Sequence, residues 1–225
     1  MPIVEEINCA DRAAARQACA AFIVERLAAA LAGGSAPVGL IVSGGSNPAV
    51  VLPRVAAADL DWARVKMMAG DERLAPLDHP DSTERLCREA FARAGARATY
   101  LGLDGETDPE RALALYRQDV DALPPAAVAF LGVGTDGHVA SLFPGRPEGS
   151  DLTIRTAAAP ETPPHKHPRV TLGWGALLEA AAICLIVDGP EKRAVYDAAM
   201  AGETPQLPIS ILLRQDRVPV RVFLA

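Results

Sequence analysis

Short apolar runs alternate with amphipathic stretches along most of the 225-residue chain. This is the pattern of a parallel β-sheet with helices on its faces, because parallel strands are buried on both sides and need long crossover connections. The chain therefore belongs to the α/β class. Strands are predicted at residues 38–43, 66–69, 98–103, 126–133, 169–172, 183–187 and 220–224.

Helices are predicted between these strands. An Ala-rich helix covers residues 11–31, and a second runs from Thr83 to Ala94 with Ser82 as its N-cap. Pro109 and Pro190 suit the first turns of later helices, where the missing proline N–H is not needed. We find no repeat or linker, so the whole chain, 1–225, is predicted to form a single domain.

The amino-acid composition and net charge indicate which kinds of binding partner the protein can have. Half of the residues are apolar but only 4% are aromatic, so the core must consist mainly of Ala, Val, Leu and Ile. The net charge of −6 does not favour binding to nucleic acid or to an anionic membrane. An anionic ligand would need a local cluster of basic side chains. We expect a small-molecule partner, and a monomer or a small homo-oligomer.

The four cysteines form no CxxC pair, and none lies near a histidine at metal-ligand spacing. A reducing compartment fits them better than a disulfide framework does. The first residues, MPIVEEINCADR, contain no apolar signal core, and no apolar run approaches the ~20 residues of a membrane span. These observations predict a cytoplasmic protein.

Polar, glycine-rich segments follow four of the predicted strands, at residues 43–48, 70–76, 132–138 and 188–192. The carboxyl ends of parallel strands meet at one edge of the sheet, and ligands of open α/β sheets bind there. The four segments therefore predict one shared crevice.

The segment LGVGTDGH contains a literal GxGxxG at Gly132, Gly134 and Gly137. In a dinucleotide-binding fold this motif opens a long helix. Here Pro144 and Gly145 follow within ten residues of Gly137, which disfavours such a helix. We expect neither a nicotinamide nor any other cofactor.

His138 ends the same segment, just beyond a buried strand. A histidine can act as a base near neutral pH, and Asp136, two residues earlier, can hold and polarise its ring. The alternative is a histidine that only caps the next helix.

Three further groups suit a phosphorylated ligand. Arg73 can bind phosphate in a bidentate manner and Asp71 can accept hydrogen bonds from hydroxyl groups, although DER triplets are more often solvated ion pairs. Lys192 is one of only three lysines beside 19 arginines, and it follows a strand at a predicted helix start. It suits phosphate as a point charge, or is an ordinary exposed helix residue.

The turn SGGSNP, residues 43–48, joins a strand to a helix. Its free N–H groups can hold an anion, or it is a plain connection.

In TPPHKHP, His165 and His167 lie close in sequence, but prolines surround them and no third ligand is apparent. A solvated loop is therefore favoured over a metal site, and we expect no metal.

With SGGSNP, DERLAP, GTDGHVASLFPG, RVT and GPEKRAV in this order, the chain closely resembles the 6-phosphogluconolactonase family. The resemblance spans Val38 to Leu213, and DGHxASLFP is its most specific part. Two positions depart from the family pattern: Asn47 replaces the usual Thr and Thr83 the usual Asn. Both stay polar, and we interpret them as tolerated variation.

The resemblance implies a Rossmann-like fold shared with sugar-phosphate isomerases. It implies hydrolysis of 6-phospho-D-glucono-1,5-lactone, a step of the pentose phosphate pathway, without metal or cofactor. By motif, His138 would be the general base, supported by Asp136. The substrate-binding residues would be Gly44, Gly45, Ser46, Asp71, Arg73, Gly137, Arg169 and Lys192.

Two alternatives remain. Glucosamine-6-phosphate deaminases share a GxDGH segment, but they continue with A-F-N-E-P, where the Glu partners the catalytic His. Phe143 stands at that position here, and Arg73 stands where deaminases usually have Tyr. A non-catalytic sugar-phosphate sensor would need a partner-binding module, for which the chain has no spare length.

Overall fold

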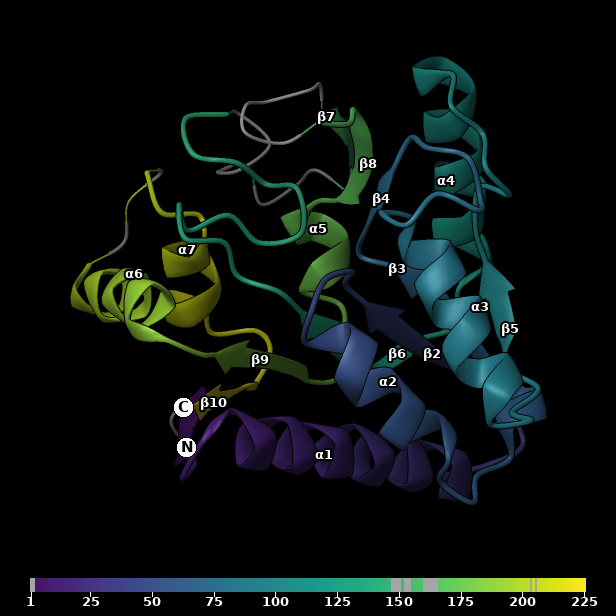
Figure 1. Ribbon diagram of the computed structural model, residues 1–225, viewed down its shortest axis with the longest axis horizontal. Coiled ribbons are helices and arrows are strands. Elements are labelled where there is room, and N and C mark those ends of the chain that lie inside the picture. Colours follow the sequence, from purple (N-terminus) through teal and green to yellow (C-terminus); the bar gives the residue numbers. More distant parts are fainter. Residues whose placement is uncertain (1–2, 147–150, 152–154, 160–165, 203, 205) are drawn as a thin grey trace.

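The computed structural model describes residues 3–146, 151, 155–159, 166–202, 204 and 206–225. Within these residues the chain forms a parallel sheet of seven strands in the order β1-β10-β9-β6-β2-β3-β5, with helices on both faces (Figure 1). The predicted α/β class is confirmed. The strands are β1 Val4–Asn8, β2 Val38–Val42, β3 Val65–Ala69, β5 Thr99–Leu101, β6 Ala126–Leu131, β9 Ile183–Val187 and β10 Val220–Leu224.

The core has two parts, one on each face of this sheet, because successive strand side chains point to opposite sides. Leu40 and Val42 of β2 pack with one group of helices, and Ile41 packs with the other. The first face is covered by α1 Arg12–Ala32, α2 Pro48–Ala56 and α3 Thr83–Arg93, with the 3₁₀ helix Trp62–Arg64. The second face is covered by α4 Pro109–Ala122, α5 Trp174–Leu177, α6 Pro190–Ala201 and α7 Ile209–Arg214.

The helices begin where the sequence predicts. The side chain of Asp11 accepts a hydrogen bond from the Ala14 N–H at 2.8 Å, and Ser82 caps α3 by accepting from the Arg85 N–H at 3.1 Å. Pro109 and Pro190 occupy first helical turns. Side-chain capping satisfies N–H groups that have no partner within the helix, which fixes each start to one residue.

A second sheet of three antiparallel strands corrects two predictions. It consists of β4 Asp71–Arg73, β8 Arg169–Leu172 and β7 Thr156–Ala159. Residues 70–76 were expected to be a loop, and residues 169–172 a strand of the main sheet. Gly70 explains both differences: its N–H donates to Val42 O of the main sheet at 2.7 Å, and its C=O accepts from Leu172 N of the small sheet at 2.8 Å.

The first strand, β1, was not predicted. It pairs in parallel with β10 at the edge of the sheet, so the two chain ends lie side by side (Figure 1). Its sequence, VEEIN, carries two exposed glutamates, and an edge strand with a polar face lacks the apolar run by which central strands are found. No helix of the described part has both the length and the apolarity that a membrane span requires.

Gly39 of β2 lies close against the backbone that leads into β6. A Cβ at this position would lie 2.4 Å from Pro124 O and 2.9 Å from Ala126 Cα, where the register between β2 and β6 shifts. We predict that Gly39→Ala lowers the free energy of unfolding by about 1–3 kcal/mol, because the obstructing atoms are backbone and cannot rotate away. Urea denaturation measures this, with Gly202→Ala as control.

At Gly202 no heavy atom of the described residues, its chain neighbours apart, lies within 4 Å of the added Cβ, and φ is −170°, so the control should unfold like the parent protein. An equal free energy of unfolding of the two variants would show that the backbone around position 39 shifts to accept the methyl group without loss of stability.

Candidate active site

A cavity of about 260 Å³ lies at the carboxyl edge of the main sheet, where the four predicted polar segments meet. Eight of the ten residues singled out from sequence line it: Gly44, Gly45, Ser46, Asp71, Arg73, His138, Arg169 and Lys192. Side chains from β4, β8, α6 and the loops after β2 and β6 thus converge on one space, as the strand-end argument predicts. Asp136 and Gly137 lie next to this lining rather than in it.

His138 is fixed by a tight turn after β6. The Gly134 N–H donates to His138 O at 3.0 Å, and Gly137 adopts a φ of +85°, which glycine reaches without strain. Nδ1 of His138 lies 2.5 Å from Oδ1 of Asp136, and the His138 side chain is 17% exposed. The expected pairing of His138 and Asp136 is therefore present.

Asp136 is suited to orient this imidazole. Partial burial raises its pKa, but the hydrogen bond and the charge of His138 outweigh that effect and lower the pKa to about 2. The carboxylate therefore stays ionised at neutral pH. An ionised acceptor at Nδ1 fixes the ring tautomer and leaves Nε2 as the nitrogen that exchanges a proton.

The GxGxxG segment does not form a dinucleotide-binding turn. Residues 132–146, all of which the structure describes, contain no helix, so the glycines have no helix N-terminus behind them. Gly137 packs away from the cavity instead. A Cβ at Gly137 would lie 2.8 Å from Leu207 Cδ2. The C=O of Gly137 accepts from the Ile209 N–H at 3.0 Å, which anchors the turn to the start of α7.

A buried ion pair forms the floor of the site. Nη1 of Arg169 donates to Oδ2 of Asp71 at 3.0 Å, and Oγ of Ser141 donates to the same oxygen at 2.7 Å. Burial raises the pKa of Asp71, but the charges of Arg73 and Arg169 and the Ser141 hydroxyl lower it by more, so the net shift is downward. Ser141 was not among the predicted residues, although it lies within the ASLFP motif.

Arg73 lies against the turn after β2. Its Nη1 donates to Asp81 O at 2.8 Å, and a Cβ on Gly44 would lie 3.1 Å from this Nη1 and 2.5 Å from Thr83 Oγ1. Only glycine at position 44 leaves room for both groups. Arg73 Nε, Thr83 Oγ1 and Ser43 Oγ are buried without a hydrogen-bond partner in the described structure. Buried donors of this kind call for an acceptor, and a bound oxyanion would supply it.

Glu72, which the sequence did not single out, holds Arg73 in place. Its Oε1 accepts from the N–H groups of Arg73 and Thr83 at 2.8 and 2.9 Å, and its Oε2 accepts from the Glu84 N–H at 2.6 Å. Burial raises the pKa of Glu72 to about 7, while the three N–H donors act in the opposite direction. The carboxyl group thus ties β4 to the first turn of α3.

Lys192 lines the cavity from the first turn of α6. Its Nζ lies 3.3 Å from Oδ1 of Asp188, and Nε of Arg12 lies 2.7 Å from the other oxygen of this carboxylate. One turn along α1, Nε of Arg16 donates to Oδ1 of Asn47 at 2.8 Å. Sequence reasoning missed Arg12 and Arg16, yet their i, i+4 spacing near the start of a helix was a usable signal.

Lys166 and His167 of the HKH segment do not line this cavity. Lys166 is exposed, and His165 is outside the described residues. His167 was expected in a solvated loop. Instead its Nε2 lies 3.2 Å from Oδ2 of Asp81, and its ring contacts that of His79.

Comparison with known proteins agrees with this geometry. The family model of glucosamine-6-phosphate isomerases and 6-phosphogluconolactonases matches residues 10–220. The chain belongs to this family. A 6-phosphogluconolactonase of Pseudomonas putida is 39% identical over 85% of the chain and 81% of its own length. One of Caulobacter vibrioides is 38% identical over 84% of the chain and 83% of its own length.

Solved structures of the family share the fold. A 6-phosphogluconolactonase of Shewanella baltica superposes with a TM-score of 0.85 at 29% identity, covering 100% of this chain and 97% of its own. A monomeric glucosamine-6-phosphate deaminase reaches a TM-score of 0.78 at 19% identity, covering 98% of this chain and 96% of its own. The fold is thus common to both branches of the family and does not distinguish them.

Phe143 packs beside the histidine of the cavity. Its ring centroid lies 5.0 Å from that of His138, and Cζ of Arg169 lies 5.9 Å from the same Phe143 ring. Position 143 is therefore next to the histidine, as the comparison of ASLFP with A-F-N-E-P suggests. An apolar ring stands where the deaminase pattern has a carboxylate.

We predict that Glu72→Ala lowers the free energy of unfolding by at least about 1–3 kcal/mol, the cost of leaving one buried donor without an acceptor. Three N–H groups lose their acceptor in this variant, so the first turn of α3 should loosen. Thermal and urea unfolding measure the loss. Glu110→Ala is the control, since Glu110 also lies in the first turn of a helix but is exposed. A loss no larger than that of the control would contradict the capping role.

Proposed function

We propose that this protein hydrolyses 6-phospho-D-glucono-1,5-lactone to 6-phosphogluconate, with His138 as the general base. The observation that carries the proposal is the convergence, in one cavity, of a carboxylate-oriented histidine and two cationic side chains from different strand ends, Arg73 and Lys192. The similarity to 6-phosphogluconolactonases, over 84–85% of the chain, supports the choice of substrate.

The reaction needs one base and an oxyanion site. A water molecule attacks the lactone carbonyl carbon C1 while Nε2 of His138 takes its proton, a step that contributes typically ~10²–10⁴-fold. The tetrahedral intermediate carries its negative charge on the former carbonyl oxygen, for which backbone N–H groups of the glycine-rich turns at 44–46 and 132–134 are the candidate donors. The C1–O5 bond then breaks, and the His138 proton passes to the departing ring oxygen. The acid product releases a proton to solvent.

The phosphate group positions the ring. We assign it to Arg73 and Lys192, with the buried hydroxyl of Thr83 close to Arg73 and that of Ser43 in the cavity lining. Asp71 is assigned to a sugar hydroxyl, since its ionised carboxylate lines the cavity. Arg169 lies within the cavity wall but its Nη1 is engaged with Asp71, so its role is to hold that carboxylate rather than to bind phosphate. Fixing the ring at its phosphate end lowers the entropic cost of reaching C1.

The deaminase alternative is disfavoured by Phe143. Deamination with isomerisation must move protons between carbon atoms and a leaving amine, and a phenyl ring beside His138 cannot take part in such transfers. A sensor without catalytic activity would not need Asp136 to orient His138.

A lactonase assay with freshly prepared 6-phosphogluconolactone, corrected for spontaneous hydrolysis and run beside the unphosphorylated lactone, tests the proposal directly. No rate above the spontaneous reaction would refute it.

We predict that His138→Ala lowers kcat by ~10²-fold or more and leaves the affinity for 6-phosphogluconate nearly unchanged. The reason is that His138 acts on water in the transition state, whereas the phosphate contacts are made elsewhere in the cavity. Turnover by stopped assay and product affinity by calorimetry separate the two effects. A variant that keeps more than about a tenth of the parent activity would rule out the general-base assignment.

We predict that Arg73→Ala and Lys192→Ala each lower kcat/KM for the phosphorylated lactone by roughly tenfold or more, since a charge-assisted hydrogen bond contributes about 1.5–3 kcal/mol. The slow reaction with gluconolactone should barely change. Arg73→Lys should rescue only in part, because a point charge does not replace the planar fork. Arg97→Ala, which removes an exposed cation before β5, controls for overall charge. An equal loss of kcat/KM with both lactones would show that these residues do not bind the phosphate group.

A further inference from the structure

A second group of metal-binding side chain types lies beside the candidate active site. His79 and Asp81 belong to the loop between β4 and α3, and His167 lies just before β8. Because β4 and β8 pair antiparallel, with Arg73 opposite Arg169, the residues after β4 meet the residues before β8. The Leu74 N–H donates to Pro168 O at 2.9 Å and continues this contact beyond the strands. Segments 86 residues apart are thus held together by the sheet.

The three side chains present their ligand atoms to one point. One nitrogen of each histidine and a carboxylate oxygen of Asp81 all lie within 4.8 Å of one another. Nε2 of His167 and Oδ2 of Asp81 are 3.2 Å apart, and the two imidazole centroids are 4.9 Å apart at an interplanar angle of 75°. Two ligand atoms on one tetrahedral zinc ion lie roughly 3.4 Å apart. Small side-chain rotations are therefore enough to complete a site.

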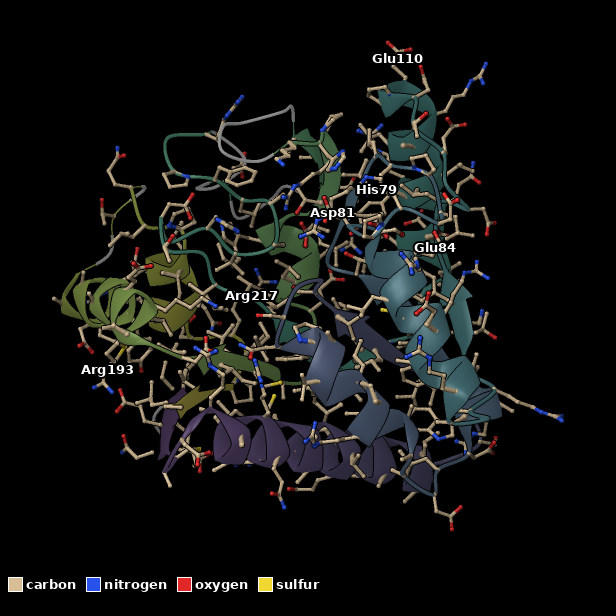
Figure 2. The ribbon with its side chains drawn as sticks, in the orientation of Figure 1. His79, Asp81, Glu84, Glu110, Arg193 and Arg217 are labelled. Atoms are coloured by element: carbon tan, nitrogen blue, oxygen red, sulfur yellow. The ribbon has the colours of Figure 1, made fainter. Side chains whose placement is uncertain are left out.

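The surroundings favour an exchangeable ion. The His167 side chain is 23% exposed and that of Asp81 is 53% exposed, so an ion can enter from solvent. The Asp81 N–H donates to Nδ1 of His79 at 3.1 Å, which holds this ring beside the carboxylate (Figure 2). Two imidazoles and one carboxylate suit zinc and its neighbours cobalt and nickel better than magnesium or calcium, which prefer oxygen ligands.

We propose that His79, Asp81 and His167 bind a divalent transition-metal ion of the zinc class, with one coordination position left for water. The site lies outside the lactonase cavity, and none of its three side chains lines that cavity. Its link to the cavity is the backbone of Asp81, whose C=O accepts the hydrogen bond of Arg73 at 2.8 Å. A bound ion joins the β4–α3 loop to the segment entering β8, so it stabilises the fold at the point where Arg73 is held.

The test uses the full chain after treatment with a chelator, in a Cys9→Ser background that removes the one cysteine of the four that is not buried. Zinc chloride alone is titrated by calorimetry, and unfolding is followed with and without zinc. We expect saturable binding of about one ion per chain and a rise in Tm. Cobalt should give the visible absorption of a nitrogen- and oxygen-ligated site without thiolate charge transfer.

His167→Ala and His79→Ala should each weaken zinc binding by at least ~10-fold, the lower end of what even supporting residues of metal sites contribute. His138→Asn is the matched control and should bind zinc like the parent, because the active-site histidine is not a ligand. Far-UV circular dichroism confirms that each variant is folded. The measurements contain no substrate, so their outcome is independent of the lactonase assay.

Absence of saturable zinc binding in the Cys9→Ser protein overturns the proposal, as does unchanged affinity in both histidine variants. Loss of binding in His138→Asn alone would place the zinc at the candidate catalytic residue and would equally overturn it. In each of these cases the His79–Asp81–His167 group acts only as an ion pair beside a ring contact.

Discussion

The ion pair between Asp71 and Arg169 is the contact on which the arrangement of the site depends. It lies where β4 and β8 run side by side, and Ser141 joins it from the loop after β6. Loss of one partner would leave a buried charge without compensation, at a cost of about 3–5 kcal/mol. The pair therefore fixes three segments relative to one another. Once β4 is fixed, Glu72 and Arg73 are directed toward α3 and the turn after β2.

The local charge of the cavity differs from that of the whole chain. The net charge is −6, yet among the described residues Arg73, Arg169 and Lys192 line the cavity beside a single carboxylate, that of Asp71. At physiological ionic strength, charges more than about 8 Å away are largely screened, so the nearby cations determine what a bound phosphate experiences. Two carboxylates also hold cations in a fixed geometry before substrate binds: Asp71 holds Arg169, and Asp188 holds Lys192.

Strands and helix starts could be predicted from the sequence where neighbouring residues alone indicate burial or capping. They could not be predicted where strand pairing between residues far apart in the chain decides the structure. The six apolar residues of β6 and the Ser82 cap are recognisable from their neighbours alone. The three polar residues of β4 become a strand only because residues 169–171, almost 100 positions later, pair with them. His167 was assigned to a solvated loop for the same reason: its partners His79 and Asp81 are brought to it by that pairing.

The site residues were predictable for a related reason, with one limit. Strand ends of a parallel sheet converge, so eight of the ten named residues share one cavity. The contact between Arg16 and Asn47 was not predicted, because it joins the first turns of α1 to the start of α2, 31 residues later. Contacts between helices and loops depend on how these elements pack in three dimensions, and short sequence motifs do not predict that packing.

The imidazole of His138 has a polar neighbour on one side and an apolar neighbour on another. Asp136 holds Nδ1 of His138 on one side, and Phe143 packs against the ring on another. An apolar neighbour supplies no proton, so in the proposed mechanism His138 alone would move a proton between the attacking water and the ring oxygen. Lactone hydrolysis requires no more than that single relay, whereas a reaction that moves protons between carbons requires a second carboxylate. Under the proposed mechanism, the phenyl ring beside His138 therefore favours lactone hydrolysis over a reaction that moves protons between carbon atoms.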